Sequence, residues 1–260
     1  MDKELVYGPE KVIVSNLFSG YLKWGGFPEV ALSESEFEKN KILKEYLTSI
    51  FFRDLVERYK IENNTLLEIL LDRLLSSFSQ KFSLTSFYKQ YKGKFPFSKD
   101  TLFKYYHYFL MSMLIFEVRK FSESSYKRMR NPAKIYLVDT GIARRVTSED
   151  RGKLLENIVF LELRKRSEEI FYFEEEKECD FVVRNNNKFY AYQVCFELTE
   201  DNREREIKGL VTSCYWLGLK KGIILTYAQE EEIDWGGIKI KIIPAWKWLL
   251  EKKRAGEYRL

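Results

Sequence analysis

Three polar side chains in the second half of the chain have the types and order of a divalent-metal site. Glu156 lies in a stretch with apolar residues at helical spacing, whereas Asp180 and Gln193 lie in two neighbouring strand-like stretches. Oxygen ligands suit Mg²⁺ and Mn²⁺, and such an ion activates water for phosphodiester hydrolysis. Glu197 shares a strand face with Gln193 if side chains alternate regularly, which makes it a further candidate ligand.

A β-hairpin and the elements around it must position these residues. The stretch "ECDFVVRNNNKFYAYQVCFEL", residues 178–198, contains two strand-like segments around "NNN", and Asn tolerates the left-handed backbone of tight turns. Asp180 opens the first strand, and Gln193 interrupts an apolar part of the second. The periodicity elsewhere predicts a helix over 153–166, a strand over 170–175, an amphipathic helix over 202–219, a buried strand over 221–227, and a final strand and helix over 238–253.

The first half of the chain reads as a series of helices that ends in a two-stranded ribbon. A short helix should end at Gly25-Gly26, and a long helix should begin at Ser35, where Glu38 completes capping-box spacing. Three helices followed by a ribbon is the order of a winged helix-turn-helix, whose third helix enters the DNA major groove. The expected elements are helices over 65–79, 83–93 and 98–114, the last with Ser98 as its N-cap, and strands over 114–122 and 133–139.

Positive charge is concentrated in this part of the sequence. Residues 73–134 hold 13 Lys or Arg against 3 Asp or Glu, a net charge of +10, whereas the whole chain carries only +5. A localised basic segment is typical of nucleic-acid binding, although a solubilising surface is the alternative. The candidate DNA contacts are Lys99, Thr101 and Lys104 near the start of the third helix and Lys120, Lys127, Arg128 and Arg130 along the ribbon.

The order of the candidate site residues resembles the PD-(D/E)XK restriction-endonuclease-like fold. In that fold a helical Glu, a strand Asp and a strand Glu-x-Lys form the metal site. The chain also resembles the C-terminal region of a family of archaeal and bacterial AAA-type ATPases, in which a winged helix and a nuclease-like domain follow the ATPase domain. The matching stretches are "YLKWGGFPEV", "IFFRDLVERYKI", "KIYLVDTGI", "LLENIVFLELRKR", "ECDFVV", "YQVCFEL" and "REREIKGL".

Two departures from that family bear on function. The chain has no GxxxxGK[ST] phosphate loop, so the resemblance implies no ATPase activity for it. Gln193 and Cys195 stand where the family has Glu and Lys, which removes one negative ligand and the cation beside the attacking water. Lys188 or Lys208 could replace that cation, and Glu197 could replace the carboxylate. A purely structural alternative pairs Glu156 with Arg205.

We therefore expect a DNA-binding, nuclease-like accessory region of an AAA-type ATPase with a degraded metal site. One alternative is an active Mg²⁺- or Mn²⁺-dependent nuclease. Another is a protein-interaction or oligomerisation module that uses the aromatic helix 98–114 and the Trp-rich stretch "PAWKWLL" to bind an ATPase domain or a second copy. The predicted fold class is α/β, or α+β overall, with a helical linker over 1–60, a winged-helix-like domain over 61–148 and a nuclease-like domain over 149–260.

Composition narrows the function classes. Of the 260 residues, 45% are hydrophobic and 32% are charged, which is typical of a globular protein. No apolar run is long enough to span a membrane and the N-terminus has no signal-peptide pattern, so we expect a cytoplasmic chain without a membrane partner. His107 is the only histidine, and the three cysteines form no CxxC pair, which argues against a zinc site, a Ser-His-Asp triad and a disulfide framework.

Overall fold

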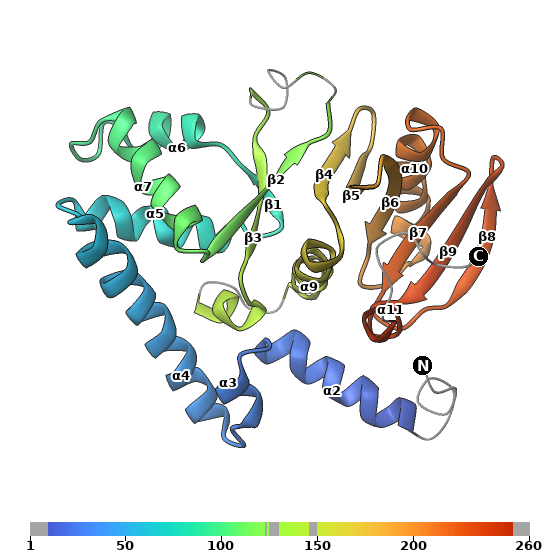
Figure 1. Ribbon diagram of the computed structural model, residues 1–260, viewed down its shortest axis with the longest axis horizontal. Coiled ribbons are helices and arrows are strands. Elements are labelled where there is room, and N and C mark those ends of the chain that lie inside the picture. Colours follow the sequence, from blue (N-terminus) through green and yellow to red (C-terminus); the bar gives the residue numbers. More distant parts are fainter. Residues whose placement is uncertain (1–9, 123, 125–129, 146–149, 252–260) are drawn as a thin grey trace. The chain divides into compact units, whose positions relative to one another are not determined.

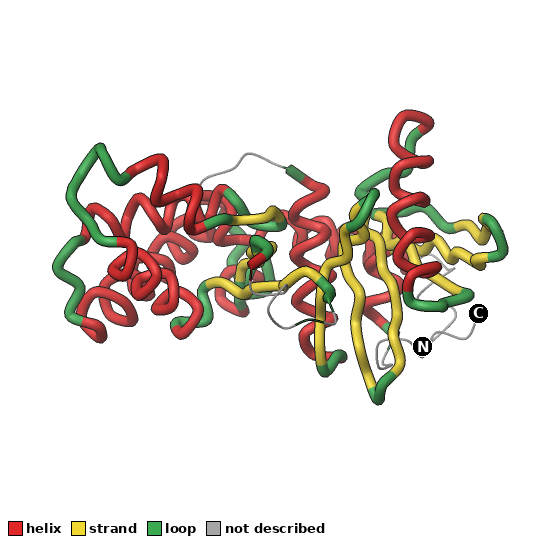
Figure 2. The backbone as a smooth tube through the Cα atoms, turned by 90° about the horizontal axis from the view of Figure 1, so that it is seen from above, coloured by secondary structure: helices red, strands yellow, loops and turns green. Residues whose placement is uncertain are grey.

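The computed structural model describes residues 10–122, 124, 130–145 and 150–251. The fold is α+β, as expected. The chain divides into two compact units. The helical unit takes the described residues of Lys23–Glu117 and Pro132–Asp150, and the sheet unit takes those of Met1–Leu22, Val118–Asn131 and Arg151–Leu260. In Figure 2 the first is mainly helix, and the long strands belong to the second.

The helical unit is built on helices with well-formed N-caps. The side chain of Ser35 accepts a hydrogen bond from the backbone N–H of Glu38, and that of Ser98 accepts one from Thr101, so both predicted caps are confirmed. Gly25 has φ of 79° and follows the end of the first helix, as expected. The elements are α2 (Glu10–Trp24), which begins in the sheet unit, α3 (Pro28–Leu32), α4 (Glu36–Ser49), η1 (Ile50–Glu57), α5 (Asn64–Ser76), α6 (Leu84–Tyr91), α7 (Lys99–Met111) and η2 (Thr140–Arg145).

Three short strands accompany these helices (Figure 1). They are β1 (Gln80–Phe82), β2 (Ile115–Lys120, whose last residues belong to the sheet unit) and β3 (Ala133–Leu137). β1 pairs antiparallel with β3, and β3 is also the neighbour of β2. The sequence pattern missed β1 because three residues carry no periodic signal. It also predicted one continuous helix after Ser35, whereas α4 passes into the π-helical η1 at Ile50.

The sheet unit has the order β2-β4-β5-β6-β7-β9-β8. The strands β4, β5 and β6 pair antiparallel, whereas β7 pairs parallel with both β6 and β9. The strand β8 was not predicted, because a mostly exposed edge strand shows little apolar alternation. The elements are α9 (Arg151–Arg166), β4 (Glu169–Glu174), β5 (Glu178–Asn185), β6 (Lys188–Val194), α10 (Glu200–Trp216), β7 (Lys221–Thr226), β8 (Glu231–Trp235), β9 (Ile238–Pro244) and α11 (Ala245–Leu250).

Helices pack on both faces of this sheet. Leu210 and Cys214 of α10 share a buried cluster with Val182 and Ala191 of the hairpin strands. The next residue along β6, Tyr192, faces the other way and contacts Trp248 of α11, with ring centroids 6.0 Å apart. Alternation along β6 therefore separates a face covered by α10 from a face covered by α11 and α9.

The structure bears on the expected partner-binding surface and on the expected absence of a membrane-spanning helix. Trp246 and Trp248 of the Trp-rich stretch are buried, so they form no exposed surface for a partner. The described helices include none with the length and low charge content that crossing a lipid bilayer requires.

Candidate functional site

A polar cavity of about 420 Å³ opens in the sheet unit where β5, β6, α9 and α10 meet. It brings together three of the predicted site residues, Glu156, Asp180 and Gln193, and also Cys195. Further charged residues that line it are Glu176, Lys177, Glu178, Arg205 and Glu206. The hairpin creates this arrangement. Asn186 and Asn187 have φ of 47° and 60°, which confirms the expected left-handed turn and sets the register of β5 against β6.

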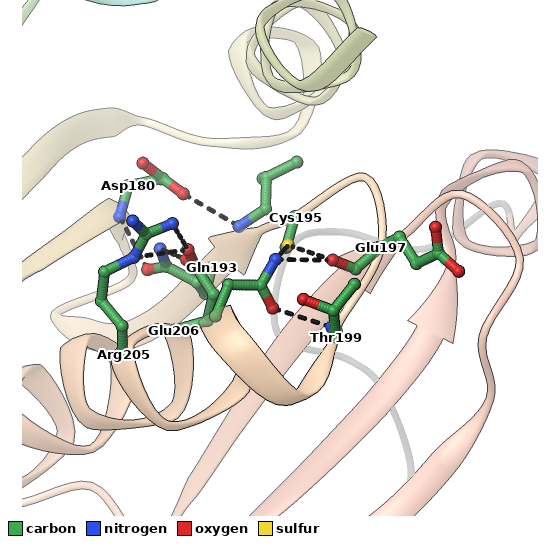
Figure 3. A network of polar contacts seen from close by, with 9 residues as sticks. Asp180, Gln193, Cys195, Glu197, Thr199, Arg205 and Glu206 are labelled. Atoms are coloured by element: carbon green, nitrogen blue, oxygen red, sulfur yellow. Dashed lines mark hydrogen bonds and ion pairs between the residues drawn. The ribbon is translucent and has the colours of Figure 1, made fainter.

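Hydrogen bonds between the two strands fix the positions of Asp180 and Gln193 (Figure 3). The backbone N–H of Asp180 donates to Gln193 Oε1 over 3.2 Å, and Asp180 Oδ2 accepts from the backbone N–H of Val194 over 2.9 Å. Both side chains are buried, with exposed fractions of 6% and 5%. The amide oxygen of Gln193, the atom expected to face a metal ion, is therefore engaged by the protein itself.

Glu206 completes this network and was not predicted as a site residue. Gln193 Nε2 donates to Glu206 Oε2 over 2.6 Å, and Arg205 donates to Glu206 Oε1 through Nη2 over 2.6 Å and through Nε over 3.1 Å. Glu206 is only 8% exposed. The sequence pattern indicates that Glu206 is buried. Glu206 lies at helical spacing from Leu210 and Ser213, on the buried face of the predicted helix, where a carboxylate needs a partner.

A glycine lets α10 approach close enough for this contact. A Cβ atom at Gly209 would overlap the backbone carbonyl oxygen of Glu178 on β5. The absence of a side chain therefore allows the helix to lie directly on the hairpin, one turn after Glu206.

Cys195 and Glu197 do not supply what the site lacks. Burial raises the pKa of the Cys195 thiol to about 11, so at neutral pH the group is an uncharged thiol where the resembling family has a lysine. Glu197 is exposed, does not line the cavity, and points away from Asp180 in Figure 3. The expectation from strand alternation fails because β6 ends at Val194, before Glu197.

The two candidate replacement lysines are also elsewhere. Lys188 begins β6, five residues before Gln193, which corresponds to about 16 Å along an extended strand. Lys208 is half-exposed and pairs with Glu204 at 2.5 Å. Across residues 10–122, 124, 130–145 and 150–251, no group of three His, Cys, Asp or Glu side chains is placed to hold a metal ion. These donors do not fit the predicted Mg²⁺ or Mn²⁺ ion.

The basic candidates differ in how far their side chains are exposed. Lys99 and Lys104 are exposed on α7, each lying over an aromatic ring of the same helix, Phe103 and Tyr108. Thr101 is half-buried, and its hydroxyl is 2.8 Å from that of Ser98.

The ribbon candidates differ in the same way. Lys120 is paired with Glu175 at 3.4 Å, whereas Arg130 is exposed. Lys127 and Arg128 lie outside the described residues. Of the ribbon candidates Lys120 and Arg130, which are both described, only Arg130 has an exposed side chain.

Comparison with known families divides the chain at the start of α9. Residues 15–152 match a family described as "Domain of unknown function (DUF8612)". The chain belongs to the DUF8612 family. Residues 151–248, which follow its DUF8612 region and contain the polar cavity, match "Domain of unknown function (DUF4143)".

Two relatives are similar to this DUF8612 protein over most of its length. An uncharacterized protein of Methanocaldococcus jannaschii is 35% identical over 256 residues, which cover 93% of this chain and 57% of the relative. An uncharacterized protein of Haemophilus influenzae is 26% identical over 246 residues, which cover 92% of this chain and 59% of the relative. The chain thus spans less than two thirds of the length of these relatives.

Proposed function

We propose that this chain is a DNA-binding, nuclease-like accessory region that works beside an AAA-type ATPase domain and has lost its metal chemistry. The Gln193–Glu206 contact is the observation that carries the proposal. In the resembling nuclease fold the residue at this place is a carboxylate that binds metal. Here a neutral amide occupies it, and both polar ends of that amide are hydrogen-bonded inside the protein.

The residues around Gln193 favour an amide over a carboxylate at this position. A second carboxylate at residue 193 would meet Glu206 without a proton between them, whereas the amide donates to it. Arg205 offsets the charge of Glu206 from the outer side. Asp180 lies on β5, and its Oδ2 accepts a hydrogen bond from the backbone of β6. The polar groups of the scaffold are thus satisfied without an ion.

DNA binding is supported by the order of elements in the helical unit. Along the chain the elements follow the order α5-β1-α6-α7-β2-β3, and in the sheet the strands have the order β1-β3-β2. This order is compatible with a winged helix in which α7 is the recognition helix. The exposed side chains of Lys99 and Lys104 lie near the start of α7. Their rings beneath, Phe103 and Tyr108, hold the two ammonium groups on the helix surface, where phosphates can reach them.

The ATPase part of the proposal has a different support. The DUF4143 match is of a kind found in AAA-ATPase-associated proteins, and the curated relatives are longer than the aligned region. A region that holds DNA beside a motor needs affinity for the phosphate backbone and no chemistry of its own.

Fluorescence anisotropy with a labelled duplex tests DNA binding directly. Lys99→Glu/Lys104→Glu should weaken binding by at least about tenfold and lower the slope of log affinity against log salt by about two, because two phosphate contacts are lost. The matched control is Lys41→Glu/Lys44→Glu, which makes the same charge change on exposed lysines of α4. Equal weakening by both pairs would mean that net charge, and not α7, determines affinity. No binding by the wild-type chain would refute the proposal.

A further inference from the structure

A second cavity, of about 540 Å³, lies on the face of the sheet that α10 covers, at the end of that helix. The helix ends at Trp216, and the sheet continues beyond it through Glu169, Arg184 and Phe189, which are register neighbours on β4, β5 and β6. In the described part of the chain no further helical turn covers these residues, and their side chains are partly exposed. This cavity and the polar cavity of the candidate site share no lining residue.

Four of the eight residues that line it are aromatic. Phe121 stands edge-on to Phe171 and Phe189, with centroid distances of 5.6 and 5.4 Å, and to Trp216 at 6.4 Å. Trp216 is 56% exposed, although an indole is a costly group to leave in water. The four rings come from β4, β6, α10 and the residue that follows β2, and Trp216 is the ring that ends the helix.

The polar edge of the cavity consists of an ion pair. Arg184 is paired with Glu169, and the two side chains are 43% and 40% exposed. An aromatic wall beside one donor-rich and one acceptor-rich group suits a flat ligand with a polar edge, and a nucleobase has both properties.

The chain connectivity supplies a second reason for a nucleic-acid ligand. Phe121 and Ser122 line the cavity, and the sequence that follows them directly carries three of the predicted DNA-contacting cations, Lys127, Arg128 and Arg130. This proximity in sequence favours a nucleic-acid ligand over an uncharged flat ligand.

We propose that this aromatic cavity binds an unpaired base of a DNA strand, stacked against Trp216 and bounded by Phe121, Phe171 and Phe189. The inference rests on the proposed DNA-binding function and narrows it to DNA with a single-stranded portion. Stacking of a base on an aromatic side chain tolerates every base, so the selected feature is the unpaired strand and not its sequence.

Paired binding measurements separate this inference from the function on which it rests. The probes are a blunt duplex and the same duplex with a five-nucleotide 3′ or 5′ overhang that contains 2-aminopurine. For the wild-type chain, one of the overhangs should raise affinity by about tenfold, the effect of one stacked base, and 2-aminopurine fluorescence should be quenched. In Trp216→Leu and in Phe189→Leu both effects should disappear, while affinity for the blunt duplex stays unchanged.

The control variant is Trp235→Leu, which removes an indole that is 40% exposed on β8 and does not line the cavity. It should keep the overhang effect. Equal affinity for all duplexes, or an overhang effect that survives in both cavity variants, overturns the inference and leaves the proposed function standing. Failure to bind even the blunt duplex overturns the proposed function and the inference together.

Discussion

Replacement of Gln193 by Glu should turn the central contact of the candidate site into a repulsion. Two carboxylates would then meet where the amide donates to Glu206 over 2.6 Å, in a place where the exposed fractions are only 5% and 8%. Charges ~4 Å apart repel by ~4 kcal/mol at an effective dielectric constant of about 20. Proton uptake by one carboxyl limits the loss, so Gln193→Glu should lower the free energy of unfolding near pH 8 by about 2–3 kcal/mol.

The sign of the pH dependence follows from that proton. In the variant, one of the two carboxyls has its pKa raised by its neighbour, so its contribution to stability is present at acidic pH and is lost as pH rises through the raised pKa. The matched control is Gln193→Glu/Glu206→Gln, which keeps one amide facing one carboxylate with the hydrogen bond reversed. Its stability should lie within ~1 kcal/mol of wild type, because the lost Arg205 pair is exposed on the arginine side and contributes little.

Urea unfolding followed by far-UV circular dichroism, from pH 5 to pH 8, measures both effects. We expect the single variant to have a lower free energy of unfolding than wild type, by an amount that grows with pH and largely vanishes in the double variant. If Gln193→Glu is as stable as wild type at pH 8, or if the double variant is as unstable as the single one, Gln193 does not donate to Glu206 and the description of the site is wrong.

Three further predictions concern single residues. Gly209→Ala should lower the free energy of unfolding by about 1–3 kcal/mol in urea titrations, because its Cβ overlaps the carbonyl of Glu178; an unchanged midpoint would mean that α10 does not lie on β5 as described. Burial raises the pKa of Cys195 to about 11, so its thiolate fraction should be about 300-fold lower than that of an ordinary thiol with a pKa of about 8.5. Iodoacetamide should therefore label Cys195 far more slowly in the native chain than in the urea-unfolded chain. Equal labelling rates would contradict the burial of this thiol. Burial also raises the pKa of Asp139, so the stability of wild type relative to Asp139→Asn should be greatest at acidic pH and should decline as pH rises through the raised pKa. Urea unfolding curves of both proteins near pH 4 and pH 7 measure this difference. A difference in stability that grows with pH would refute the prediction.

The elements that position the site could be predicted because each has a strong local signal. Apolar spacing predicts α9 and α10, and the three asparagines predict a left-handed turn that Asn186 and Asn187 adopt. Ser35 and Ser98 are capping residues in the sequence and in the structure. The short strand β1 and the edge strand β8 depend on pairing with distant strands, β3 and β9, and a single sequence shows too little of that pairing to predict them.

The candidate site was predicted in part for the same reason. Asp180 and Gln193 lie on strands joined by a turn, so their proximity follows from local pattern. Glu206 reaches Gln193 only because α10 packs on the hairpin, and that is a tertiary contact. Glu197 was placed by extending the alternation of β6 beyond Val194, where the strand ends and the rule no longer applies.

A gel assay with labelled duplex DNA, run in Mn²⁺ and in EDTA, tests most directly whether this chain holds DNA without cutting it. The prediction is a retarded band whose strands stay intact, equally in both buffers. Cleavage that requires Mn²⁺ and disappears in Asp180→Ala would contradict the loss of metal chemistry. Absence of a retarded band would contradict DNA binding itself.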